Sequence, residues 1–155
     1  MSPPSGSRST PENKAREKID ALLAQSGWTV QDRDAMNLTV PAVAVREFKL
    51  ERGHGFADYL LFLDGQAVGV CEAKPAGVPV RNVEVQALKY VDGLPATLDA
   101  PHKPLPFAYV STGEETAFIN HLDPLPRTRE VFTFHRPETL REYFDAHLLG
   151  LRRQW

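Results

Sequence analysis

The residues best suited to chemistry in this chain are three charged side chains at the ends of two apolar runs. Asp58 opens the first run, Glu72 and Lys74 close the second, and an Asp-Gly turn at 64–65 separates the two. An apolar strand has no structural use for two carboxylates and an ammonium group at its ends. Phosphodiester cleavage does, because carboxylates hold Mg²⁺, the ion polarises the phosphate and activates water, and a nearby lysine stabilises developing charge. The set therefore indicates metal-dependent hydrolysis of a phosphodiester. A strand cap at Asp58 and a surface ion pair of Glu72 with Lys74 at a strand end would also explain the same residues.

Strand geometry places a condition on this set. Glu72 and Lys74 are two residues apart and share one face of a strand, and Asp58 must reach the same face from the neighbouring strand. A two-residue turn with regular pairing would set Asp58 opposite Cys71, with Glu72 on the other face. We predict instead a three-residue loop over 63–65, or a β-bulge elsewhere in the hairpin that has the same effect.

Hydrophobic spacing and turn signals indicate the elements that position these residues. A first helix is predicted over 11–25, because Thr10 is a favourable N-cap, Pro11 suits the first helical position and Gly27 ends the pattern. The other predicted elements are strands over 43–50, 56–63, 66–73, 107–111, 116–120 and 130–134, and helices over about 82–91 and from 137 onward. This order predicts an α/β fold with a central mixed β-sheet flanked by helices.

The composition is that of one globular domain. The 155 residues are 42% hydrophobic and 25% charged, and the net charge of −2 gives no global signature of nucleic-acid binding, although basic residues can still cluster locally. The single cysteine excludes an internal disulfide and suits a reducing compartment, and no apolar run could span a bilayer. We expect a disordered lead-in over 1–10, one domain over 11–150, a C-terminal tail over 151–155 and a cytoplasmic location without membrane attachment.

Further motifs surround the charged set in a defined order. They are Gly-Phe-Ala-Asp-Tyr at 55–59, Glu-Ala-Lys at 72–74, Gln-x-x-x-Tyr at 86–90, the segments 106–115 and 131–140, and Pro-Glu-x-x-x-Arg at 11–16 with Gly-Trp at 27–28. Together they resemble the amino-terminal nuclease module of the type I restriction enzyme R subunit, a branch of the PD-(D/E)xK superfamily. The resemblance extends along nearly the whole chain and implies a restriction-endonuclease-like fold.

The resemblance also implies a role for each residue of the charged set. Asp58 and Glu72 would bind Mg²⁺, and Lys74 would assist the attacking water. Glu12 resembles an acid of the first helix that some members of the superfamily aim at the metal. A first-turn glutamate that the helix dipole favours is an equally good account of Glu12.

Gln86 and Tyr90 match the helix motif that members of the family need for cleavage. The two residues are four apart on a predicted helix, so they share a face and could contact DNA near the site. Without the resemblance, a solvated glutamine and a core tyrosine would explain the same pattern.

The function that the resemblance implies is a Mg²⁺-dependent endonuclease that cuts double-stranded DNA without sequence specificity of its own. Its implied partners are methyltransferase and specificity subunits and a helicase-like motor. This sequence has no Gly-x-x-x-x-Gly-Lys-Ser/Thr phosphate loop, so ATP would act only through a motor region absent from the chain. The alternative is a catalytically silent DNA-binding or assembly module that retains the fold, against which the intact charged set argues.

Overall fold

The computed structural model describes residues 10–51, 53–80, 94–102 and 105–153. The elements in chain order are α1 (Pro11–Gln25), β1 (Thr29–Asp32), the 3₁₀ helix η2 (Arg33–Ala35), β2 (Ala42–Lys49), β3 (Phe56–Leu63), β4 (Gln66–Ala73), β5 (Phe107–Ser111), β6 (Thr116–Asn120), β7 (Arg129–Val131) and α3 (Pro137–Arg153). The helix predicted over 82–91 and nearly all of the lead-in predicted over 1–10 lie outside the described residues. Helix α3 continues past 150, into the segment expected to be a tail.

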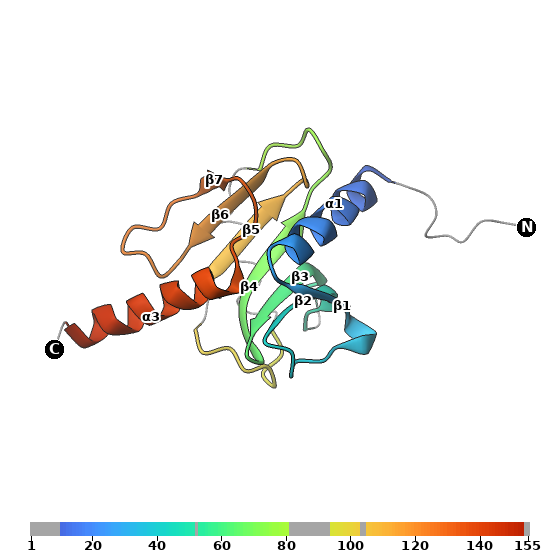
Figure 1. Ribbon diagram of the computed structural model, residues 1–155. Helices are drawn as coiled ribbons and strands as arrows, with labels where there is room; N and C mark the ends of the chain where they lie inside the picture. The colour runs from blue at the N-terminus through green and yellow to red at the C-terminus, as the bar shows by residue number, and fades with distance from the viewer. Residues whose placement is uncertain (1–9, 52, 81–93, 103–104, 154–155) are drawn as a thin grey trace, which may run out of the picture.

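The described strands form one seven-stranded mixed sheet in the order β1 to β7 (Figure 1). Neighbours β1 and β2 run parallel, as do β4 and β5, and the other neighbouring pairs run antiparallel. The predicted α/β class and mixed sheet are therefore confirmed. Strand β1 was not predicted, and β7 is shorter than the segment 130–134 that was expected in its place.

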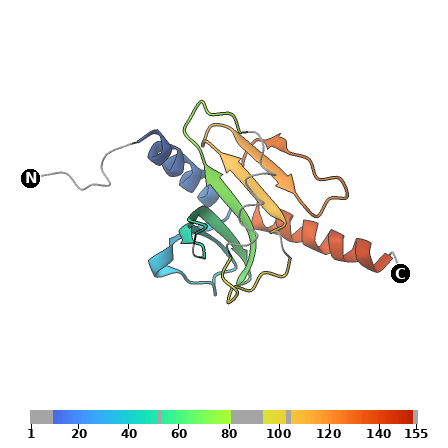
Figure 2. The same cartoon turned by 180° about the vertical axis from the view of Figure 1, so that it is seen from behind.

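Helices α1 and α3 pack on the same face of the sheet (Figures 1 and 2). The core on this face joins Ile19 of α1 and Leu140 of α3 to aromatic residues of the sheet such as Tyr109. On the opposite face, the sheet packs against irregular segments that include Leu94 and Leu105. Neither helix in the described part of the chain has the length and apolar character needed to cross a bilayer.

The ends of α1 are set by the residues that the sequence indicated. The Thr10 side chain accepts a hydrogen bond from the backbone N–H of Asn13 at 3.1 Å, and Pro11 occupies the first turn. After the helix, Gly27 adopts a φ of +101°, which a residue without a Cβ reaches at little cost. The prediction of a helix over 11–25 is confirmed.

The turn between β3 and β4 has two residues, so the predicted three-residue loop is wrong. Leu63 pairs with Gln66 across the turn. The central residues Asp64 and Gly65 have φ values of +50° and +81°. Positive φ at both central positions matches the right-handed twist of the strands, and aspartate and glycine tolerate it better than other residues.

A β-bulge in β4 supplies the change of register that the odd-length loop was expected to supply. The pairing shifts partway along the hairpin, and Val68 is the additional residue. Beyond the bulge, Tyr59 pairs with Cys71. The next position along β3, Asp58, consequently lies opposite Glu72 in the register of the hairpin. The bulge that was the second prediction is confirmed. The effect expected of it is not, because Asp58 turns toward α1 whereas Glu72 lies on the other face of the sheet.

Acid sensitivity of the folded state should arise at His135, a half-buried histidine between the sheet and the start of α3. The hydroxyl of Tyr109 lies 2.6 Å from Nδ1 of His135. Burial, and to a smaller extent the charge of Arg129, lowers the pKa of His135 from 6.5 to about 4. The unfolded chain therefore takes up this proton before the folded chain does. Stability from the neutral ring is complete above pH 6.5 and is lost as the pH falls toward about 4.

We expect the His135→Gln variant to lose less stability than the wild type between pH 6.5 and pH 4. The difference should be about 1 kcal/mol after allowance for solvent screening, or about 2–4 °C in Tm. Thermal unfolding followed by circular dichroism across this range measures it. The exposed His54 provides the matched control, because His54→Gln should keep the wild-type pH dependence. Parallel curves for wild type and His135→Gln would contradict the assignment.

Candidate functional site

Strand β2 breaks the alternation of side chains near its C-terminal end. Val45 and Phe48 belong to the same core cluster although three positions separate them. Between them, Glu47 has a φ of +49°, in the left-handed region that residues other than glycine rarely adopt. As a result, the consecutive side chains Arg46 and Glu47 both reach residues of α1.

Strand β3 breaks its alternation at the same level of the sheet. Ala57 and Leu60 both belong to the core cluster on the face away from α1. The two residues between them turn toward the helix: Asp58 contacts Arg16, and the hydroxyl of Tyr59 donates a hydrogen bond to Asp20 at 2.6 Å. Paired irregularities in β2 and β3 thus aim polar side chains at α1, where regular strands would aim half of them away.

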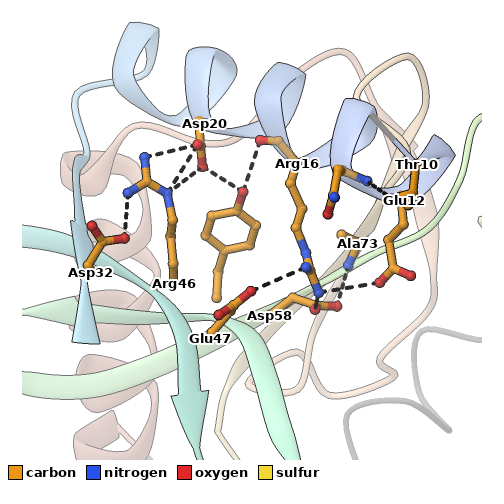
Figure 3. A network of polar contacts seen from close by, with 11 residues as sticks. Thr10, Glu12, Arg16, Asp20, Asp32, Arg46, Glu47, Asp58 and Ala73 are labelled. Atoms are coloured by element: carbon orange, nitrogen blue, oxygen red, sulfur yellow. Dashed lines mark hydrogen bonds and ion pairs between the residues drawn. The ribbon is translucent and has the colours of Figure 1, made fainter. Parts of the chain in front are cut away.

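Helix α1 meets the sheet with two adjacent stripes of side chains. The apolar stripe is buried and consists of Ala15, Ile19 and Leu23. The charged stripe follows the same helical spacing and consists of Glu12, Arg16 and Asp20. The charged stripe lies over β2 and β3 (Figure 3).

Asp58 lies where β3 and β4 separate, beyond the last pair of the hairpin. Its Oδ1 accepts a hydrogen bond from Nη2 of Arg16 at 2.5 Å, and its Oδ2 accepts one from the backbone N–H of Ala73 at 2.8 Å (Figure 3). The side chain is 15% exposed. The Ala73 N–H belongs to the peptide between Glu72 and Ala73, so the Asp58 carboxylate rests against the backbone of the Glu-Ala-Lys segment.

Glu72 and Lys74 lie on one side of β4, as their spacing predicts. Nζ of Lys74 is 3.4 Å from Oε1 of Glu72, and the Glu72 side chain is only 12% exposed. Strand alternation directs Glu72 away from Cys71 and Ala73, which belong to the core beneath α1. Asp58 therefore approaches this segment from between the strands and from the α1 side, and does not project with Glu72 from one flat face.

In addition to burial, Asp58 and Glu72 both raise the pKa of one group in β4, the thiol of Cys71. The pKa of the Cys71 thiol is raised well above its ordinary value by burial, and then by the charges of Asp58 and Glu72. Burial by itself would lower the pKa of Arg16, but the hydrogen bond and charge of Asp58, together with the charges of Glu12 and Glu47, outweigh it and raise that pKa. Arg16 is thus a permanent cation beside Asp58.

A second polar network anchors α1 one turn further along. Arg46 bridges two carboxylates, with Nη2 at 2.9 Å from Oδ2 of Asp20 and Nη1 at 2.8 Å from Oδ1 of Asp32. The pKa of Tyr59 is raised by burial and by its hydrogen bond to Asp20, so the hydroxyl keeps its proton as a donor. This network holds α1 to both strands that carry the irregularities.

The other predicted site residues are Glu12, Gln86 and Tyr90, and of these the structure describes only Glu12. Oε1 of Glu12 is 3.4 Å from Nη2 of Arg16, so Glu12 shares this arginine with Asp58. Gln86 and Tyr90 lie outside the described residues. Within the described part of the chain, no three or more histidine, cysteine, aspartate or glutamate side chains gather to hold a metal ion. Asp58, Glu72 and Glu12 are therefore not assembled into one cluster.

Two residues of the site, Arg16 and Glu47, were missed by sequence reasoning as participants. Arg16 was noted only as part of the first-helix motif. For Glu47, a signal does exist in the sequence: the apolar positions 43 and 45 are odd, whereas 48 and 50 are even. Such a change of parity within a strand is typical of a bulge or a residue of unusual φ.

The chain is similar to type I restriction enzymes in sequence family and in fold. Residues 20–117 match the family model described as the type I restriction enzyme EcoKI endonuclease subunit second domain. A search of curated proteins found no match. Among solved structures, the fold is similar to a fragment assigned as an HsdR subunit of a type I restriction enzyme from Vibrio vulnificus YJ016, with a TM-score of 0.61 and 21% identity. The similarity covers 90% of this chain and 26% of that one.

Proposed function

Because the chain belongs to the family of the type I restriction enzyme endonuclease subunit, we propose that it is the DNA-cleaving domain of such an enzyme. In this proposal, it is a Mg²⁺-dependent endonuclease with a PD-(D/E)xK site and a restriction-endonuclease-like fold. The observation that carries the proposal is the contact of the Asp58 carboxylate with the Ala73 amide, inside the Glu72–Lys74 segment. This contact unites two motifs that are fourteen residues apart, and it depends on a bulge that regular strand pairing would not contain.

The donor groups at this place fit a hard divalent cation. Asp58 and Glu72 offer carboxylate oxygens, the ligands that Mg²⁺ prefers. Both side chains are largely buried, and each already faces a basic group, Arg16 and Lys74 respectively. Mg²⁺ is commonly held by one or two carboxylates together with water and substrate phosphate, so two protein ligands suffice. When bound, the ion would polarise the phosphate and lower the pKa of a water molecule.

The remaining roles follow from the chemistry of the side chains. Lys74 would orient the attacking water and stabilise charge on the phosphoryl oxygens, since it lies beside Glu72 and is partly exposed. Glu12 would be an additional acid near the ion, reached through Arg16. Gln86 and Tyr90 would contact DNA, as in the sequence-based prediction.

This chain corresponds to about a quarter (26%) of the HsdR chain that it resembles. Recognition of a DNA sequence and movement along DNA would come from methyltransferase and specificity subunits and from a motor region that uses ATP. We therefore propose double-stranded DNA as the substrate, the cytoplasm as the location, and weak cleavage by this chain in isolation.

The test combines cation binding with DNA nicking. Calorimetry with Mg²⁺ and Mn²⁺ should show binding that falls at least about tenfold in the Asp58→Asn/Glu72→Gln double variant, because both ligands lose their charge. Nicking of supercoiled plasmid in Mn²⁺ should be lost in the same variant. The matched control is Asp64→Asn/Glu114→Gln, which removes two exposed carboxylates that pair with Arg141 and Lys18. This control should bind the cation and nick DNA as the wild type does.

The outcomes separate the proposal from its alternative. Cation binding that survives the Asp58→Asn/Glu72→Gln change would refute the site. Equal nicking by wild type and both variants would mean that the nicking comes from a contaminant. DNA binding without cation binding by the wild type would favour the silent DNA-binding or assembly module.

A further inference from the structure

Arg16 is the point at which three carboxylates from three elements meet. Its Nη2 contacts Asp58 of β3 at 2.5 Å and Glu12 of α1 at 3.4 Å, and its Nη1 contacts Glu47 of β2 at 3.3 Å (Figure 3). Asp58 is one of the two carboxylates assigned to the cation in the proposed function, on which this inference rests. The oxygen of Asp58 that faces α1 is thus already bound to a positive charge.

The three partners differ in how much they depend on Arg16. The Asp58 side chain is 15% exposed, whereas those of Glu12 and Glu47 are 46% and 64% exposed. Water can compensate the two exposed carboxylates, but a largely buried carboxylate needs a cation close by. Either the guanidinium or a metal ion can satisfy Asp58, and the two would compete for the same Oδ1.

If a metal ion displaced Arg16 from Asp58, the guanidinium would still have two carboxylates to pair with. Arg16 would keep Glu12 and Glu47 as partners after leaving Asp58, so its own charge would not be stranded. Glu47 reaches Arg16 only because its backbone adopts a φ of +49°, across the strand pair from Asp58. Strained conformations of this kind persist where the surrounding structure requires them, often at functional sites.

We propose that Arg16 is an exchangeable counter-ion of the metal site. In the absence of a divalent cation, its guanidinium neutralises Asp58 and holds the carboxylate against the Ala73 amide. When a cation binds, Arg16 releases Asp58 and remains paired with Glu12 and Glu47. Arg16 is therefore a positioning residue that keeps the site closed and correctly oriented until the cation arrives.

The test measures the dissociation constants for Mg²⁺ and Mn²⁺ by calorimetry, without reference to cleavage. Arg16→Gln should tighten binding about threefold to tenfold, because the cation no longer displaces a charged hydrogen bond from Asp58. The same variant should unfold at a lower temperature than the wild type without the cation, and should gain more in Tm when the cation is added. Arg16→Lys, which keeps the charge, should restore affinity toward that of the wild type.

A second substitution, Glu47→Gln, is expected to change the cation affinity in the opposite direction. Glu47→Gln removes one of the two carboxylates that receive the guanidinium, so it should weaken cation binding by about twofold to fivefold. General damage to the site would weaken binding in both variants, so the sign reversal excludes general damage. Arg141→Gln is the control for net charge, since this arginine pairs with the exposed Asp64 on another part of the surface, and it should leave both constants unchanged.

The results distinguish this inference from the proposed function. If Arg16→Gln binds the cation equally or more weakly while Asp58→Asn/Glu72→Gln abolishes binding, the metal site stands and the exchange is refuted. If the wild type binds no divalent cation, both the proposed site and the exchange are refuted.

Discussion

Replacing Lys74 with alanine is expected to reduce DNA nicking by about 100- to 1,000-fold and to leave cation affinity close to that of the wild type. In the proposed site, Lys74 stabilises charge that develops only during cleavage, and it is not a ligand of the ion. Its Nζ lies 3.4 Å from Oε1 of Glu72, and an ammonium group has no lone pair to offer the ion. Loss of the ammonium group therefore removes stabilisation of the transition state without removing a metal ligand. Plasmid nicking in Mn²⁺ and calorimetry on the same preparations measure the two quantities.

The matched control for this change is the exposed lysine at the end of β2. Lys49→Ala removes the same charge from the surface and should keep both nicking and cation affinity. Wild-type nicking by Lys74→Ala would show that another group stabilises the charge. A parallel loss of cation affinity and nicking would assign Lys74 to the structure of the site and not to the chemical step.

Gly69→Val is expected to cause the largest loss of stability, about 3 kcal/mol, or about 6–12 °C in Tm. Gly69 pairs with Phe107 where β4 and β5 run parallel. A Cβ at this position would lie 2.9 Å from the carbonyl oxygen of Phe107 and 3.2 Å from its Cβ. The first of these atoms belongs to the backbone of a central strand and cannot move without disturbing the sheet. Chemical denaturation and thermal unfolding should both show the loss.

Two further glycine substitutions serve as comparisons for the loss of stability in Gly69→Val. Gly69→Ala should cost less than Gly69→Val, about 1–3 kcal/mol, because only the Cβ contact remains. Gly150→Ala in α3 meets no atom within 4 Å and should be neutral or stabilising by up to about 1 kcal/mol. Gly69→Val with wild-type stability would mean that β4 and β5 separate more easily than their pairing indicates.

Much of the local structure could be predicted because short-range signals determine it. The caps of α1 and the bounds of β3 and β4 follow from the residue types at their ends. The two-residue turn was not predicted, because an Asp-Gly pair is compatible with a loop of either length. The position of the bulge could not be derived in the same way. Val68 is an ordinary strand residue, and the additional residue becomes evident only from the pairing on both sides of it.

The centre of the candidate site was harder to predict, because it depends on contacts between distant segments. Arg16 and Asp58 are 42 positions apart, and no local pattern links them. The parity change around Glu47 was a usable signal, but it indicates only that the strand is irregular. Which partner Glu47 reaches depends on where α1 lies across the sheet, and the packing of Ile19 and Leu23 determines that position.

The apolar and charged stripes of α1 differ in how strictly they fix the position of the helix on the sheet. Apolar contacts are non-directional, so the apolar stripe would tolerate a small slide of the helix along its axis. Ion pairs and hydrogen bonds require particular distances and angles, so Arg16 on Asp58 and Asp20 on Arg46 do not tolerate the same slide. The charged stripe therefore fixes the position of α1 along its axis. A small displacement of α1 along its axis would therefore be felt at the Asp58 carboxylate before it disturbed the contacts of the apolar stripe.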